Sequence, residues 1–477
     1  MSRIERDSLG EKEIENDRYY GIQSLRAKEN FPISGQKVHP LLIKNLAYIK
    51  KAAALMNLEV GLLEKSIAGA IVKAANEIIE GKFLDDFIID AIQGGAGTSV
   101  NMNINEVIAN RAIELLGGKK GDYSVVHPNN HVNMSQSTND VFPTAIKMTT
   151  IVLLTELIEE LKNLRDCLKE KSNEFDEVVK VGRTQLQDAI PIRLGQEFKA
   201  YSLVVDRDIR RLQASLESVM IVNMGGTAIG TCLNADELYT KGIVDKINEV
   251  SGFHLVQAED LIDATQNNDS LLEVSSLLKT CAVNLSKIAN DLRLISSGPR
   301  AGISEINLPA VQPGSSIMPG KINPVIPEVL NQVSFQVIGN DLTITMAIEA
   351  GQLELNAMLP IVAFNLFESI QILKNAVNTF TINAIKGLTA KELRCKNLVE
   401  NSLTLITALT PHLGYETCSV IAQKALKSGK NIRDVILEEG YLSENEVDRI
   451  LNPYEMTKGG IVAKDLLNKK GKRSFSD

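Results

Sequence analysis

Two long stretches of the sequence repeat apolar residues every three or four positions. The first begins near Val141 and places leucine or isoleucine at positions 151, 154, 157, 158, 161, 164 and 168. The second keeps this spacing from Leu271 to Ile295 and stops before Gly298-Pro299. The spacing is typical of amphipathic helices, and about thirty residues at ~1.5 Å each make a helix of roughly 45 Å. Helices of this length predict a bundle.

Three further stretches, at residues 195–222, 324–355 and 362–380, also have helical spacing, with no strand-like alternation between them. Only 4% of the 477 residues are aromatic, and such a composition favours helices packed by aliphatic side chains. We therefore expect a mainly α fold with a long central helical bundle. The predicted domains are an N-terminal domain at residues 1–138, the bundle domain at 139–391, and a small C-terminal helical domain at 392–477 that ends in a basic tail at 469–473.

Two of these helical stretches are apolar on more than one face, at residues 151–154 and 270–278. This pattern indicates burial on opposite sides of a helix and favours an oligomer in which several chains share one core. A large monomeric bundle is the alternative.

The charge and the Cys and His residues argue against several classes of function. The formal net charge of -8 disfavours a nucleic-acid surface, which needs clustered Lys and Arg. Five widely separated cysteines fit neither a disulfide framework nor a zinc site, and the five histidines form no metal-ligand pair at helical spacing with a carboxylate, so we expect no metal and no cofactor. The first residues contain no apolar signal segment, and no run reaches about 18 apolar residues, so we expect a cytoplasmic protein without a membrane partner.

The segment Gly-Ser-Ser-Ile-Met-Pro-Gly-Lys-Ile-Asn-Pro at residues 314–324 combines turn-forming residues with two hydroxyls, one cation and one amide. Its glycines permit unusual backbone geometry, and Pro324 suits the first turn of a helix, whose free N–H groups attract anions. An ordinary Ser/Gly turn before a helix is the simpler interpretation. The added Lys321 and Asn323 favour a mobile anion-binding loop.

Three other segments are dense in hydroxyl and amide groups: residues 97–103, 135–140 and 182–188. Each alone could cap a helix, as Asp140 could for the long helix from Val141. Together with the 314–324 loop, they predict a pocket of short donors around a small substrate with carboxylates. No phosphate-binding or dinucleotide motif accompanies them, so nucleotide binding is disfavoured.

A donor-rich pocket suits removal of a proton from the carbon beside a carboxylate. Negative charge then builds on the carboxylate, and each preorganised donor that stabilises it lowers the barrier by about 3 to 4 kcal/mol. Ser315 is the candidate base, because Lys321 and the helix terminus near Pro324 favour its alkoxide form. Closure of the loop would exclude water.

These segments, in this order, resemble the aspartase and fumarase superfamily, and the 314–324 segment matches its signature. The resemblance covers nearly the whole chain. Residues 17–23, 97–103, 133–140 and 298–302 are most similar to the aspartase branch, whereas fumarases usually have Ser-Ser-Asn-Asp where this chain has Ser-Thr-Asn-Asp at 137–140. Argininosuccinate and adenylosuccinate lyases differ within the signature loop.

The resemblance implies a homotetramer with a shared helical bundle, and active sites that are each built from three subunits. It also implies reversible deamination of L-aspartate to fumarate and ammonia, with Ser315 as the catalytic base. The implied substrate-binding residues fall into three groups by role. The side-chain carboxylate would be held by Thr98, Ser137, Thr138 and Ser316, the other carboxylate by Lys321, Asn323 and Thr184, and the amino group by Asn139 and Gln185.

Gln185 stands where fumarases and some aspartases have His, so a histidine–glutamate acid–base pair with Glu328 is excluded. Other aspartases also have Gln, so this residue disfavours fumarase. The acid that protonates departing ammonia stays open, as does the effect of Leu359, where close relatives commonly have Glu. Two alternatives remain: a fumarase or other amino-diacid lyase of the same superfamily, and a scaffold protein that has lost catalysis, as in lens crystallins that resemble argininosuccinate lyase.

Overall fold

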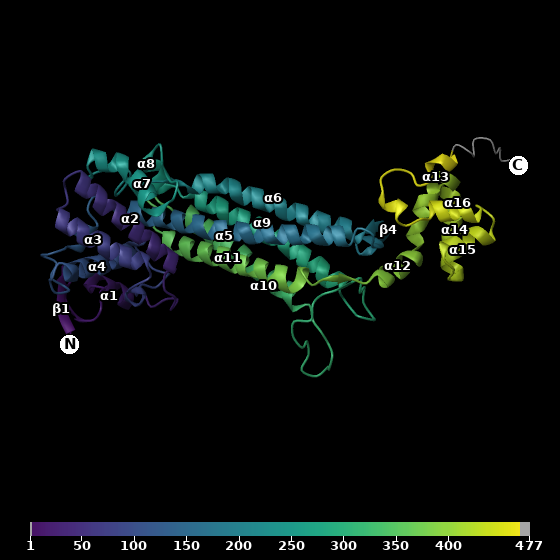
Figure 1. The fold of residues 1–477 in the computed structure, drawn as a ribbon, viewed down its shortest axis with the longest axis horizontal. Coiled ribbons are helices and arrows are strands. Elements are labelled where there is room, and N and C mark those ends of the chain that lie inside the picture. The colour runs from purple at the N-terminus through teal and green to yellow at the C-terminus, as the bar shows by residue number, and fades with distance from the viewer. Residues whose placement is uncertain (1, 468–477) are drawn as a thin grey trace. The chain divides into compact units, whose positions relative to one another are not determined.

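Five long helices dominate the computed structural model, which describes residues 2–467. Figure 1 shows them as the longest coiled ribbons. They are α5 (Thr138–Glu174), α6 (Leu194–Val219), α9 (Asp269–Ile295), α10 (Val325–Glu349) and α11 (Leu359–Phe380). Each coincides within a few residues with a helix expected from the apolar spacing, so the prediction of a mainly α fold is confirmed.

The shorter elements occupy the two ends of the sequence and the connections between long helices. The first part of the chain contains β1 (Ser2–Asp7), β2 (Gly10–Glu15), α1 (Ile22–Asn30), α2 (Pro40–Glu59), α3 (Lys65–Ile79) and α4 (Thr98–Leu115). The connections contain β3 (Val179–Thr184), β4 (Gln187–Arg193), β5 (Ile221–Val222), α7 (Glu237–Ser251), β6 (Val256–Gln257), α8 (Leu261–Gln266), β7 (Ile306–Asn307) and β8 (Thr389–Ala390). The last part contains α12 (Glu392–Glu400), α13 (Thr410–Leu413), α14 (Tyr415–Ser428), α15 (Ile432–Glu438) and α16 (Glu444–Ile450).

Short strands are the main addition to the expected elements. The described residues form four two-stranded sheets, of which β1–β2 and β3–β4 are antiparallel hairpins. We expected no strands between the helical stretches at 195–222, 324–355 and 362–380, and this expectation was wrong for β6 and β7. Each contains only two residues, too few to produce a period-two pattern.

The residues cluster into two compact units. The first unit contains the chain up to Glu159 together with 208–283 and 333–375, and the second contains 160–207, 284–332 and the chain from Ala376 onward. The three domains expected from the sequence stay a prediction. The basic tail at 469–473 lies outside the described residues.

Polar side chains join the long helices inside the first unit. Asp341 of α10 accepts hydrogen bonds from Ser275 Oγ and Lys279 Nζ of α9, at 2.7 and 2.5 Å. Lys374 Nζ of α11 lies 2.6 Å from Glu156 Oε2 of α5. These pairs fix the register of neighbouring helices, while burial of their leucine and isoleucine faces provides most of the stabilisation.

The second unit contains a separate apolar core near the end of the chain. Buried residues of α12, α14, α15 and α16 pack together with Val181 of β3. The hairpin formed by β3 and β4 is therefore anchored in this core, and its tip carries two of the predicted site residues, Thr184 and Gln185.

Helix α5 is long and apolar enough to cross a membrane by composition alone. However, 83% of its most apolar segment is buried inside the protein, which is the property of a core helix.

Candidate functional site

The N-termini of α4 and α5 meet in the first unit. Thr98 begins α4 and Thr138 begins α5, and Asn101, one turn along α4, donates from Nδ2 to Thr138 Oγ1 at 3.1 Å. Gly97, just before Thr98, has φ of 93°, and a Cβ there would lie 2.4 Å from a ring carbon of Phe142. Only glycine therefore permits this approach. The structure thus brings segments 97–103 and 135–140 together, as predicted.

Asp140 holds the start of α5 and a neighbouring loop. Its Oδ1 accepts from the Ser137 backbone N–H at 2.9 Å, and its Oδ2 accepts from Gly225 and Thr227 N–H at 3.2 and 3.1 Å. Burial raises the pKa of this carboxyl to about 6. The capping role is confirmed for Asp140, and the same carboxylate also ties the 225–227 loop to the site.

Asn139 and Ser137 face this loop with part of their hydrogen-bonding capacity unused. Asn139 donates from Nδ2 to the Ala228 carbonyl at 2.7 Å, which fixes the amide and leaves its Oδ1 as an acceptor. Ser137 Oγ accepts from the Asn139 backbone N–H at 3.2 Å and keeps its own hydrogen for another acceptor. This arrangement offers one acceptor suited to an amino group and one donor suited to a carboxylate.

A fully buried lysine supports these segments, and sequence reasoning missed it. Lys50 of α2 is 0% exposed and donates from Nζ to Asn133 Oδ1 at 2.8 Å and Gln136 Oε1 at 2.9 Å. Asn133 Oδ1 also accepts from Asn101 Nδ2 at 3.1 Å. Burial lowers the pKa of Lys50 to about 7. The available signal was a lysine whose neighbours one turn away on the same helix face are Leu46, Ala47, Ala53 and Ala54.

Thr184 and Gln185 lie at the exposed tip of the β3–β4 hairpin in the second unit. The two turn residues, Gln185 and Leu186, have φ of 54° and 62°. Non-glycine residues with this left-handed backbone cost roughly 1 to 3 kcal/mol each, and such strain is concentrated at functional sites.

A cluster of buried charges lies directly behind this tip. Glu305, which is 0% exposed, pairs with Arg183 Nη1 at 2.9 Å and with Lys180 Nζ at 3.1 Å. Lys180 Nζ also lies 2.9 Å from Glu197 Oε1. Glu305 precedes β7, and the chain after β7 leads to the 314–324 loop. One carboxylate therefore ties the hairpin to the segment that leads toward that loop.

Ser315 occupies a turn that is preorganised around its side-chain oxygen. Its Oγ accepts from the backbone N–H groups of Ile317 and Met318, at 3.3 and 3.0 Å. Two such donors stabilise an alkoxide more than a hydroxyl, so they favour ionisation of Ser315. Helix α10 begins at Val325, directly after Pro324, as expected.

Asn323 closes the base of this loop. Its Nδ2 donates to the Gly314 carbonyl at 2.6 Å, and Gly314 N–H donates to the Lys321 carbonyl at 2.8 Å. Lys321 lines two cavities of about 550 and 460 Å³. The larger is also lined by Ser315, and the smaller by Arg293, Asn323 and Lys391. A carboxylate entering the smaller cavity would meet three cations.

The predicted site residues thus form three groups. The first unit holds Thr98, Ser137, Thr138 and Asn139, and the second unit holds the hairpin pair Thr184 and Gln185 and the loop set Ser315, Ser316, Lys321 and Asn323. Convergence of all three groups on one substrate stays a prediction, and so does the role of each residue. Leu359 begins α11 and is 1% exposed, so its apolar side chain fits its surroundings.

Long bundled helices, a preorganised serine turn and a separate cluster of hydroxyl and amide groups suit a lyase that removes a proton beside a carboxylate. Comparison with known proteins agrees with this class. The family described as "Lyase" matches residues 10–339, and the family described as "Fumarase C C-terminus" matches residues 405–458. The chain belongs to this lyase family.

Individual relatives match over almost the full length. The chain is 59% identical over 467 residues to the aspartate ammonia-lyase of Bacillus subtilis, covering 98% of each protein. Among solved structures, it is similar to the fumarate lyase:delta crystallin from Brucella melitensis bound to cobalt, with 47% identity, a TM-score of 0.94, and coverage of 96% and 100% of the two chains. It is also similar to the class II fumarase from Schistosoma mansoni, with 35% identity, a TM-score of 0.91, and coverage of 96% and 99%.

Proposed function

We propose that this chain catalyses the reversible elimination of ammonia from L-aspartate to give fumarate. The observation that carries the chemistry is the pair of backbone N–H groups on Ser315 Oγ, since they stabilise the alkoxide that a serine base requires. The choice of aspartate as the substrate is supported by similarity to the aspartate ammonia-lyase of Bacillus subtilis, which is 59% identical over nearly the whole chain.

In this reaction the Ser315 alkoxide removes a proton from the carbon beside the side-chain carboxylate. Negative charge builds on that carboxylate, where hydroxyls such as Thr98 and Thr138 would stabilise it more strongly than in the ground state. The electron pair then forms the double bond, and the C–N bond breaks with its electrons on nitrogen. A protonated amino group thus leaves as neutral ammonia, so no separate general acid is required.

The second carboxylate would bind Lys321, whose cavity also presents Arg293 and Asn323. The amino group would bind Asn139 Oδ1, the acceptor that its bond to Ala228 leaves available. Gln185 can accept a hydrogen bond from an amino group but cannot change charge near neutral pH.

A homotetramer, with each active site built from three subunits, is part of this proposal. Helix α10 exposes large apolar residues that recur every three or four positions, and such a stripe is suited to packing against another chain. The stripe consists of Phe335 (63% exposed), Ile338, Leu342 and Met346. A shared site also explains why Thr184 and Gln185 are exposed at a hairpin tip.

We also propose a cytoplasmic location. The five cysteines are all free, which suits a reducing compartment.

The test is a comparison of wild type with Ser315→Ala, following fumarate formation from aspartate by its ultraviolet absorbance. We expect the variant to lose most turnover and to keep its oligomeric state on size-exclusion chromatography, because the loop is exposed. Near-wild-type turnover would assign the base to another group.

The same assay with malate addresses the main alternative. A chain that releases fumarate from malate and not from aspartate would be a fumarase, and this proposal would then fail.

A further inference from the structure

A proline in α5 removes the hydrogen bond that the helix would give to the backbone carbonyl of Asn139. In a regular helix this carbonyl accepts from the N–H group four residues later, but residue 143 is a proline, which has no N–H. The Asn139 carbonyl accepts instead from Nδ2 of Asn223 at 2.9 Å. Asn223 is 2% exposed, so a buried side-chain donor takes the place of the missing helical bond.

Asn223 is itself held in one orientation by α8. Its Nδ2 also donates to Oγ1 of Thr265 at 3.0 Å, and Thr265 uses its own hydroxyl hydrogen on the Leu261 carbonyl at 2.7 Å. Both partners of Asn223 Nδ2 are therefore acceptors, so a reversed amide would lose both bonds. The donor that supports Asn139 is thus fixed by a second buried side chain.

The loop that begins with Asn223, at residues 223–230, also holds the side chain of Asn139. Asn139 Nδ2 donates to the Ala228 carbonyl at 2.7 Å. The loop packs closely on α8, because a Cβ added at Gly230 would lie 2.4 Å from the backbone nitrogen of Ile262. One well-packed loop therefore fixes both the backbone and the amide of Asn139, and the amide presents its Oδ1 as the acceptor.

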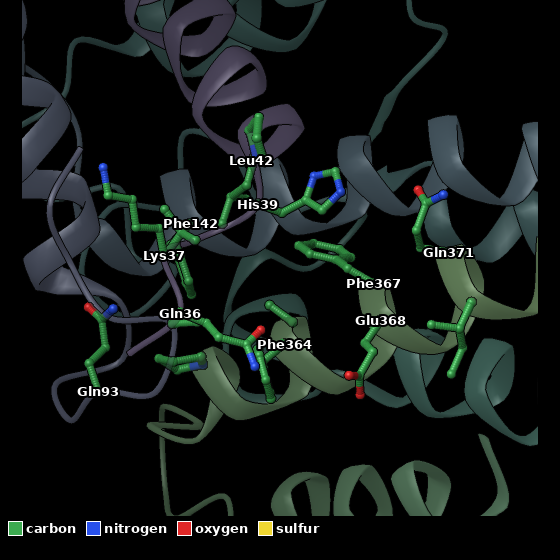
Figure 2. Close-up of a pocket in the computed structure, with 16 residues that line it drawn as sticks. Gln36, Lys37, His39, Leu42, Gln93, Phe142, Phe364, Phe367, Glu368 and Gln371 are labelled. Carbon is green, nitrogen blue, oxygen red and sulfur yellow. The ribbon is translucent and has the colours of Figure 1, made fainter. Parts of the chain in front are cut away.

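Thr138, the residue before Asn139, has other supports. Its Oγ1 accepts from Asn101 Nδ2 of α4 at 3.1 Å. One turn along α5, the Phe142 ring packs against Gly97, and Figure 2 shows this ring in the wall of an apolar cavity of about 260 Å³. The group proposed for a carboxylate is therefore held from α4, whereas the group proposed for the amine is held from the 223–230 loop.

We propose that Asn223 is a positioning residue that sets the affinity of the site for the amino group of aspartate, and for ammonia in the reverse reaction, without setting its affinity for the carboxylates. This inference rests on the function proposed above. Asn223 acts through Asn139, because a shift of the Asn139 backbone moves Oδ1 away from the substrate nitrogen.

The test uses the assembled full-length protein in the direction of amination, in which ammonium and fumarate are separate substrates. Consumption of fumarate is followed by its ultraviolet absorbance. Asn223→Leu removes the donor and keeps a similar volume, so we expect the KM for ammonium to rise about 3- to 10-fold, the effect of losing one hydrogen bond. The KM for fumarate should stay within about twofold of wild type, because fumarate carries both carboxylates and no amino group.

Gln257→Leu is the matched control. Gln257 Nε2 donates to the carbonyls of Met224 and Thr240, at 2.9 and 2.8 Å, so it supports the same loop. These two bonds use both of its donor hydrogens, and neither is directed at Asn139. The control should lower the thermal midpoint but leave both KM values within about twofold of wild type. A comparable rise of the KM for ammonium in Gln257→Leu would overturn the specific role of Asn223, because loosening of the loop would then be sufficient.

Thr265→Val provides a second variant in case Asn223→Leu does not fold. Valine has nearly the shape of threonine but removes the acceptor that orients Asn223, so the KM for ammonium should rise about twofold or more and the KM for fumarate should not change. An unchanged KM for ammonium in this variant would contradict the inference. Folding of each variant is checked by circular dichroism and size-exclusion chromatography.

The outcomes separate this inference from the function on which it rests. A wild-type protein that consumes no fumarate in the presence of ammonium would overturn both. An active wild type whose folded Asn223→Leu variant keeps its KM for ammonium, or raises both KM values equally, would overturn the role of Asn223 and leave the proposed function in place.

Discussion

Replacement of Lys50 by Met tests whether a buried lysine organises the candidate substrate site. Methionine has a similar shape, so the change removes the amine and its two hydrogen bonds without a large cavity. Asn133 would keep its bond from Asn101, whereas the bond from Lys50 to Gln136 would be lost. Because Gln136 directly precedes Ser137 and Thr138, we expect kcat for aspartate to fall at least about tenfold, through misplacement of transition-state donors.

The pKa of Lys50 gives a second, independent prediction on the pH dependence of stability. Burial lowers this pKa from 10.5 to about 7. Between these values the unfolded chain binds the proton and the folded chain releases it, so the free energy of unfolding rises with pH. From about pH 7 to about pH 9, one such group contributes roughly 2 kcal/mol. The Lys50→Met variant should lack this contribution to the rise of the free energy of unfolding with pH, as measured by urea unfolding.

Lys147→Met is the matched control, because Lys147 is also buried and burial lowers its pKa to about 8. Its Nζ donates to the Ile221 carbonyl at 2.7 Å, away from Asn133 and Gln136. In Lys147→Met, the free energy of unfolding should rise less with pH than it does in wild type, whereas kcat should stay within about twofold of the wild-type value. The reasoning is refuted if Lys50→Met retains wild-type kcat, or if its stability rises with pH as steeply as that of wild type.

Three further changes probe the second unit. Glu305→Gln removes the negative charge that pairs with buried Lys180 and half-buried Arg183, so the free energy of unfolding measured in urea should fall by about 3 to 5 kcal/mol and the KM should rise. An unchanged KM would remove the link between Glu305 and the hairpin. Leu186→Gly should raise the free energy of unfolding by roughly 1 kcal/mol, because glycine adopts the left-handed backbone of this position without strain, whereas Leu186→Ala should not raise it. Equal thermal midpoints for the two variants would exclude backbone strain at Leu186. Lys321→Ala should raise the KM for aspartate much more than it lowers kcat, and an opposite split in steady-state kinetics would end its proposed role in binding.

The long helices were predictable from the sequence because their apolar spacing persists over many turns. The starts of α5, α6, α10 and α11 lie within three residues of the expected positions. The hairpin of β3 and β4 was not predicted, because its two-residue turn contains Gln185 and Leu186 instead of glycine or asparagine. The nearest tertiary anchor of this hairpin is the pair of Arg183 and Glu305, which are 122 residues apart in the sequence and give no local signal.

The site residues were partly predictable for a different reason. Hydroxyl and amide side chains are concentrated on short polar segments, so the segments that carry Ser315, Thr98 and Thr138 were recognisable from composition, while the roles of Thr98 and Thr138 came from the family resemblance and stay predictions. Their supports lie on apolar helices or deep inside the second unit. Lys50 and Glu305 have no sequence neighbour that forms part of the candidate site, and only the folded chain brings them to it.

Both units use the same physical device to hold the predicted binding groups. In the first unit, the buried titratable side chains of Lys50 and Asp140 make hydrogen bonds that end on the 133–140 segment and the 225–227 loop. In the second unit, Glu305 pairs with Arg183, next to Thr184. A buried charge loses much of its hydration, so any displacement of its partners is expensive. Short polar loops held this way keep fixed donor positions, and fixed donors are what stabilisation of a carbanion-like transition state requires.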